Sequence, residues 1–131
     1  MIVDRNFLSS LAYAYSIRSQ GAALLRERVW WCRRNLASGR FEHPRVYCVF
    51  DCPVPVSLGR RGIVASGGHP WTEHAPLCEL RRFYARLGDT LSGLDPILSC
   101  SSDTAVILLA GQDPLDANLR RVRQALMATA V

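Results

Sequence analysis

The sequence predicts an α/β fold, in which a parallel sheet forms the middle of three layers and helices cover both of its faces. Two short apolar runs, residues 46–52 and 104–109, are rich in β-branched and aromatic residues, as are strands buried on both faces of a parallel sheet. Stretches of helical periodicity lie before, between and after these runs, and strands that alternate with helices form parallel sheets. Because two strands and the end of a third make a small sheet, we expect residues 1–131 to be a single, incomplete domain.

The first part of the chain is predicted to be mainly helical. Residues 1–4 are typical of the end of a strand, and a helix is expected over 7–18. A second helix is expected over 22–38, where Ser38-Gly39 supplies a glycine at the C-terminal end. The buried face of this second helix is predicted from apolar residues at helical spacing, Leu25, Val29, Cys32 and Leu36.

After the first apolar run, the pattern indicates a short helix over 56–61, followed by a lid-like loop at about 60–76 that is rich in glycine and proline. The next helix is marked by Leu77, Leu80, Tyr84, Leu87 and Leu91. The last helix follows the second run, and Asp113-Pro114 gives it an acidic N-cap and a proline at the first helical position. Its buried stripe is predicted to consist of Leu115, Leu119, Val122 and Leu126.

The charge of the chain comes from sixteen arginines with no lysine, for a formal net charge of +5. Such a charge is compatible with a nucleic-acid binder. The arginines are spread along the whole chain, however, which favours the use of arginine wherever lysine would serve, so nucleic acid is not the expected partner. A nucleotide phosphate site is a third interpretation, and it needs only a few arginines.

Location and redox state follow from what the sequence lacks. No run reaches the roughly 20 apolar residues of a membrane helix, and no signal peptide is evident, so we expect a cytoplasmic protein that does not bind membranes. Five cysteines in no disulfide spacing are interpreted as thiols in a reducing compartment. Cys48 and Cys52 are expected to be small buried residues of the first strand.

The pair Asp4-Arg5 has the chemistry of a phosphoryl-transfer site if it ends a strand. Ligand sites of open parallel sheets lie at the carboxyl ends of the strands. There an acid can hold a metal, directly or through water, and the planar fork of arginine can bind phosphate through two hydrogen bonds.

The segment from Asp4 to Tyr13 resembles the Asp-Arg-x-x-x-Ser-x-x-Ala-Tyr signature of thymidylate kinases. The resemblance implies a P-loop kinase fold. It also implies that Arg5 binds the phosphate of the acceptor nucleotide, that Asp4 lies by Mg²⁺, directly or through water, and that Ser9 and Tyr13 line the nucleoside pocket.

Three further segments resemble the same family in order along the chain. Residues 44–61 are similar to its Pro-Asp-strand-Leu-Asp-Val-x-Pro segment, which implies that Arg60 and Arg61 begin the phosphate lid. Residues 80–87 resemble the helix after the lid, and residues 109–115 resemble the loop beside adenine. Gly111 and Gln112 would then flank the ATP base.

The chain also departs from the family pattern. It has no Gly-x-x-x-x-Gly-Lys-Ser/Thr, the loop that holds ATP phosphates through backbone N–H groups and a lysine. Ala14-Tyr15 follow the aromatic residue where Gln or Thr and then Gly are usual, which puts thymine specificity in doubt. Leu109 replaces an acid of the adenine loop. We therefore expect that the chain alone does not hold ATP productively.

The leading hypothesis is ATP- and Mg²⁺-dependent phosphoryl transfer to a nucleoside monophosphate such as dTMP, with the chain completed by a P-loop half. The partner is then a complementary P-loop chain or a second copy of this chain. The alternative hypothesis is a non-catalytic remnant or regulatory subunit of the same fold, which binds a partner through an open sheet edge.

Simpler interpretations exist for each candidate residue. Asp4-Arg5 is also consistent with a surface ion pair, Ser9 with a helix N-cap, and Arg60-Arg61 with a solvated pair. The group His69, His74 and Cys78 matches no standard zinc spacing and is not expected to bind metal. Adjacent tryptophans cannot share one helix face, so one of Trp30 and Trp31 is expected to be exposed.

Overall fold

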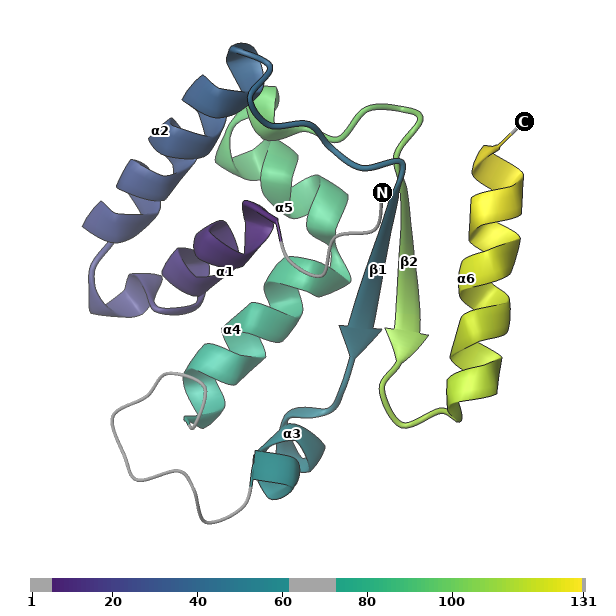
Figure 1. Cartoon of the computed structure of the whole chain (residues 1–131). Coiled ribbons are helices and arrows are strands. Elements are labelled where there is room, and N and C mark those ends of the chain that lie inside the picture. The colour runs from purple at the N-terminus through teal and green to yellow at the C-terminus, as the bar shows by residue number, and fades with distance from the viewer. Residues whose placement is uncertain (1–5, 62–72, 131) are drawn as a thin grey trace.

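The computed structural model describes residues 6–61 and 73–130. A parallel sheet of two strands lies in the middle of this part of the molecule, with β1 at Val46–Asp51 and β2 at Ala105–Ala110 (Figure 1). The register places Val46 opposite Ala105 and Asp51 opposite Ala110. The mixed α/β class and the parallel pairing predicted from the sequence are confirmed.

Most helices lie on one side of the sheet (Figure 1). Two of them precede β1, and two lie in the connection between the strands. They are α1 (Leu8–Ser16), α2 (Ala23–Ala37), α4 (His74–Ala85) and α5 (Leu87–Leu94), together with the 3₁₀ turns η1 (Arg18–Gln20) and η4 (Pro96–Leu98). Helix α1 packs against α2 and α4, and α4 also packs against β1. The side chains buried between these elements form the core.

The remaining two helices lie elsewhere. Helix α3 (Val54–Arg61) follows the carboxyl end of β1, and α6 (Leu115–Thr129) runs along the other side of the sheet from α4 (Figure 1). Among the described elements, helices therefore lie on both sides of the sheet, with α1, α2, α4 and α5 on one side and α6 on the other. None of the helices in the described ranges is both long and apolar enough to cross a membrane.

The core lies between β1 and the side of the sheet that carries α1, α2, α4 and α5, which we call the crowded side. Phe83 and Leu11 are fully buried at its centre. Near the amino end of β1, Phe7 stacks on Phe41 with ring centroids 5.1 Å apart, and Trp31 packs edge-on against Phe41 at 4.9 Å. Trp31 thus belongs to the core while Trp30 is exposed, as the sequence predicts for one of the two.

Two predictions about helix boundaries are wrong. The helix expected from Leu77 to Leu91 is two helices, because Arg86 leaves the helical conformation with φ −128° and ψ 50°. Pro114 is the N-cap of α6 rather than its first helical residue, with an extended ψ of 145°. Asp113 does not cap this helix and instead forms an ion pair with Arg121 at 3.1 Å.

The predictions of burial on the sheet and on α6 are also wrong. The strands are not buried on both faces, since Phe50, Cys48 and Leu108 are exposed. Cys52 is only partly buried. The stripe of α6 is exposed at Leu115, Leu119 and Leu126, and partly so at Val122. The reason is the same in each case, because no other described element covers these side chains.

Candidate functional site

The candidate site lies where both strands end. Parallel strands present their carboxyl ends at the same edge of a sheet, where ligands of open α/β sheets bind. After β1 the chain passes through Cys52 and Pro53 into α3, and after β2 it turns at Gly111 toward α6. The two loops therefore start from the same edge of the sheet and lead away to α3 and α6 (Figure 1).

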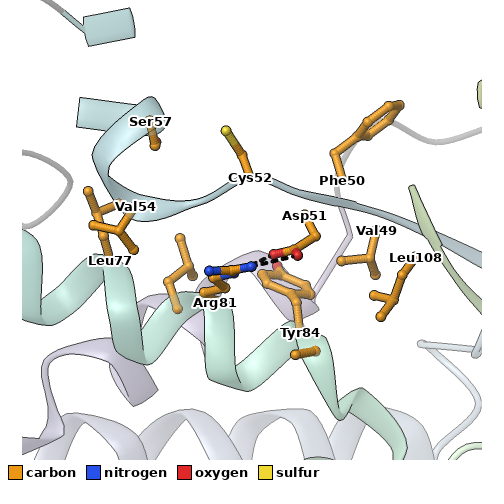
Figure 2. A pocket seen from close by; sticks show the side chains of 12 residues that line it. Val49, Phe50, Asp51, Cys52, Val54, Ser57, Leu77, Arg81, Tyr84 and Leu108 are labelled. Atoms are coloured by element: carbon orange, nitrogen blue, oxygen red, sulfur yellow. Dashed lines mark hydrogen bonds and ion pairs between the residues drawn. The ribbon is translucent and has the colours of Figure 1, made fainter. Parts of the chain in front are cut away.

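An ion pair between Asp51 and Arg81 occupies the end of β1. The Arg81 guanidinium donates from Nε to one carboxylate oxygen of Asp51 at 2.6 Å and from a terminal nitrogen to the other at 2.9 Å (Figure 2). This hydrogen-bonded pairing and the positive charge of Arg81 lower the pKa of Asp51 below its ordinary value. The same contacts raise the pKa of Arg81, so the pair is fully ionised at neutral pH.

A hydrogen bond from Arg60 connects α3 to the loop after β2. From the last turn of α3 its guanidinium donates a hydrogen bond of 3.1 Å to the carbonyl oxygen of Gly111. The side chain is exposed, and guanidinium has five N–H donors, so most of its donors remain available to an anion. The resemblance to thymidylate kinases assigned Arg60 to the phosphate lid and Gly111 to the adenine loop. The structure brings these two residues together.

Gly111 holds the loop after β2 close to the end of β1. Its N–H donates to the carbonyl oxygen of Asp51 at 2.7 Å. A β-carbon at this position would lie 3.2 Å from that oxygen and 3.4 Å from the β-carbon of Cys52. Glycine therefore permits a close approach that a larger residue would push apart.

A cleft of about 200 Å³ opens beside the ion pair. Apolar side chains of β1 and α4 form most of its walls, and the Arg81–Asp51 pair supplies its charged part (Figure 2). Apolar walls with a few fixed polar groups are typical of small-molecule sites. The residues lining the cleft include Val49, Cys52, Val54, Leu77, Tyr84 and Leu108.

The predicted acceptor-site residues lie only partly within the described structure. Asp4 and Arg5 lie outside it, as does the side chain of Arg61. Ser9 and Tyr13 are half-buried on α1, which packs against α2 and α4.

Ser9 lies within α1 and is not its N-cap. The N-cap position is Phe7, and the side-chain oxygen of Asn6 accepts the N–H of Leu8 at 2.9 Å. Gln112 is exposed next to Gly111, where it can contact a ligand bound at the strand ends.

The predicted absence of a zinc-type site at His69, His74 and Cys78 is tested only in part, because His69 lies outside the described residues. His74 and Cys78 are in contact one helical turn apart, with the Cys78 sulfur 3.5 Å from Nδ1. Across residues 6–61 and 73–130, no group of three or more potential ligands gathers to hold a metal ion.

Arg81, an exposed residue of α4, was not among the site residues predicted from the sequence. The available signal was Asp51, an acid that ends an apolar strand in the way that Asp4 was expected to do. A buried strand that ends in an acid predicts a basic partner at the same edge. It does not tell which of sixteen arginines supplies that partner.

Comparisons with known proteins do not place this chain in a family. No family model, no curated protein and no solved structure matches it.

Proposed function

We propose that the carboxyl edge of this sheet binds nucleotide phosphates, as one part of a thymidylate kinase-like phosphotransferase whose P-loop comes from a segment other than residues 1–131. The observation that carries the proposal is the contact of Arg60 with Gly111 above the end of β1. The resemblance implies that Arg60 binds phosphate and that Gly111 flanks adenine. These residues are 51 positions apart in the sequence, and they are in contact at the edge where parallel sheets bind ligands.

Each candidate residue has a role under this proposal. Arg60, with Arg61, clamps the transferring phosphoryl group, because guanidinium forms paired hydrogen bonds to phosphate oxygens. Gly111 and Gln112 flank the adenine. The acceptor nucleoside monophosphate is bound by Arg5, Ser9 and Tyr13, and Asp4 holds Mg²⁺ directly or through water.

The residues of this chain do not by themselves fit ATP with Mg²⁺. The sequence lacks the glycine-rich loop and the lysine that hold the phosphates in P-loop enzymes. The described residues also contain no group of three metal ligands. What the chain contributes is therefore arginine donors and a rigid floor for phosphate, and the rest of the nucleotide site belongs to the P-loop segment.

A complementation assay tests this function. The purified chain is mixed with a polypeptide that carries the first strand, P-loop and following helix of a thymidylate kinase, and ATP-dependent conversion of dTMP to dTDP is measured. We expect no product from either polypeptide alone and measurable product from the mixture. Arg60→Ala should lower the rate at least tenfold, because it removes a charged phosphate contact.

Arg86→Ala serves as the matched control, since Arg86 is an exposed arginine that pairs with Asp89 on α5. Its rate should equal that of the unchanged chain. A mixture that assembles but phosphorylates no nucleoside monophosphate would contradict the catalytic proposal.

A second candidate function is that of a non-catalytic subunit that binds a partner. The exposed apolar residues of β1 and α6 favour it, because such contiguous surfaces mark interaction sites on folded proteins. Assembly without phosphorylation in the same assay would support this candidate.

A further inference from the structure

Within residues 6–61 and 73–130, no strand pairs with the outer edge of β1. The carbonyl oxygen of Arg45 accepts the N–H of Ala105 at 2.8 Å, and that of Asp51 accepts the N–H of Gly111 at 2.7 Å. In a parallel ladder alternate residues turn their N–H and C=O toward the same neighbour. Tyr47 and Val49 therefore point their backbone groups toward β2. The backbone groups of the even-numbered residues Val46, Cys48 and Phe50 point toward the open edge.

Two of these even-numbered residues, Cys48 and Phe50, expose their side chains, and Val46 is half-buried. Tyr47 and Val49 are buried against the crowded side of the sheet, whereas Phe50, on the opposite face, is 64% exposed and Cys48 is also exposed. The neighbour of Phe50 on β2 is Leu109, which is fully buried. Helix α6 therefore covers this face mainly at β2 and leaves Cys48 and Phe50 of β1 exposed.

Helix α6 continues this bare surface with an apolar stripe. Its packed side is marked by Asn118, which is buried and donates a 2.9 Å hydrogen bond to the carbonyl oxygen of Ala110. The next residue, Leu119, is rotated by about 100° around the helix. For a right-handed crossover, the hand of about 98% of parallel connections, that rotation turns the stripe toward β1. The stripe consists of Leu115, Leu119 and Leu126, all exposed.

The charges beside the stripe indicate the chemistry of the partner. Arg123 lies one helical turn after Leu119 at the border of the stripe, and Arg120 lies farther round the helix. Both are exposed, and within the described structure neither forms an ion pair, in contrast to Arg121. A helix that packs on this stripe is favoured if it carries carboxylates along its edge.

The outer edge of β2 is a poorer site for a partner. The carbonyl oxygen of Ala110 points to that edge, and it already accepts the Asn118 amide and the N–H of Asp113 at 3.0 Å. Strands lie about 4.8 Å apart and a helix is about 10 Å wide, so one helix covers two strands. A helix beside α6 would thus cover β1 and one further strand beyond it.

We propose that the outer edge of β1, the exposed side chains of Cys48 and Phe50, and the apolar stripe of α6 together bind one partner. We call this area the completion surface. Its occupant is a strand that pairs in parallel with β1 and leads into an amphipathic helix with acidic flanks. This interaction depends on the open sheet alone and not on phosphate chemistry, so it is tested by binding rather than by activity.

The experiment measures binding of a labelled synthetic probe by fluorescence anisotropy. The probe has a strand of about six valines and isoleucines, a glycine turn, and a helix of about fourteen residues with leucines at helical spacing flanked by glutamates. A matched probe has lysine at every glutamate position. We expect the acidic probe to bind at least tenfold more tightly than the lysine probe.

Variants localise the binding. Phe50→Ser should weaken binding at least tenfold. Cys48→Pro should do the same, because it removes an outward N–H, and proline is tolerated where a strand edge faces solvent. Trp30→Ser is the matched control, because Trp30 is 57% exposed on a different face, and it should leave binding unchanged. Circular dichroism checks that each variant is folded.

Three outcomes would overturn the proposal. The two probes bind equally well, Trp30→Ser weakens binding as much as Phe50→Ser, or the chain sediments as a tight dimer that Phe50→Ser dissociates. In the last case a second copy of the chain occupies the completion surface.

Discussion

At the scale of single residues, the Asp51–Arg81 pair fixes the charge at the end of β1. Both side chains are partly exposed, so solvent screens the attraction between them. Because two hydrogen bonds join them, the stabilisation from this pair is near the upper end of the range for surface ion pairs. Asp51 has its pKa lowered mainly by the hydrogen bonds from Arg81. The stabilisation it gives is therefore present above the ordinary aspartate pKa of about 3.9 and is lost as the pH falls through the lower pKa of the folded state.

A double-mutant cycle measures this pair. Arg81→Ala and Asp51→Asn should each lower the free energy of unfolding by about 1 kcal/mol at pH 7, measured by urea denaturation. The double variant should lose less than the sum of the two, because the second substitution has no partner left to remove. Strictly additive losses would show that the two side chains do not interact in solution.

His43 is a second residue whose charge matters. Its Nδ1 lies 2.8 Å from the Tyr47 hydroxyl, and its ring meets Phe7 edge-on with centroids 5.6 Å apart. Burial lowers the pKa of His43 below 6.5, because desolvation disfavours the imidazolium. The folded state therefore favours neutral His43, and its contribution to stability is present above pH 6.5 and is lost as the pH falls toward the folded-state pKa.

We therefore predict that the folded chain loses stability as the pH falls from 7.5 to 5.5. The melting temperature of the unchanged chain should fall across this range, in which Asp and Glu stay ionised by their ordinary pKa values of about 4. His43→Gln should show a flatter profile because glutamine does not titrate. If both proteins lose melting temperature in parallel, His43 is not the group responsible.

At the scale of elements, the sequence located the α-helices and strands of the described part within a few residues, apart from the division between α4 and α5. It did not predict the 3₁₀ turns η1 and η4. Periodicity identifies α2 and α6 because each has apolar residues at helical spacing. The break at Arg86 was missed because Leu87 and Leu91 keep the apolar spacing of Leu80 and Tyr84 across it. Periodicity reports which side chains pack and does not report a single non-helical backbone.

Glycine substitutions test the junction between elements. Gly111→Ala places a β-carbon 3.2 Å from the carbonyl oxygen of Asp51, so it should separate the loop after β2 from β1 and lower the free energy of unfolding by about 1 kcal/mol. Gly88→Ala is the matched control, because Gly88 lies in α5 and, beyond its chain neighbours and the backbone of its own helix, no atom lies within 4 Å of the added carbon. That control should raise stability by about 0.5 kcal/mol, since alanine favours a helix.

Urea denaturation of the two variants gives the comparison directly. Opposite signs for the two changes in the free energy of unfolding exclude a general effect of replacing glycine. Equal stabilisation by both substitutions would show that the approach of Gly111 to Asp51 is looser than its 2.7 Å hydrogen bond indicates.

At the scale of the whole molecule, the parallel pairing of the strands was predicted correctly and the burial of both sheet faces was predicted wrongly. An apolar stripe such as that of α6 has the same spacing whether its own chain or a partner covers it, so the sequence cannot tell buried from exposed. For the same reason Phe50 was taken for a core residue. The resemblance singled out Arg60 and Gly111, which are hydrogen-bonded to each other in the structure. The partner of Asp51 was not, because a 30-residue separation leaves no local pattern.

The central claim is that β1 has an open outer edge that a partner completes, and amide hydrogen exchange of the isolated monomer tests it most directly. The account predicts alternation along β1, with slow exchange at Tyr47 and Val49, whose N–H groups face β2, and fast exchange at Cys48 and Phe50. Exchange at all four amides should become slow when the acidic strand–helix probe is added. Equally slow exchange at Cys48, Phe50 and their neighbours in the isolated monomer would contradict the account, because the edge would then already be paired.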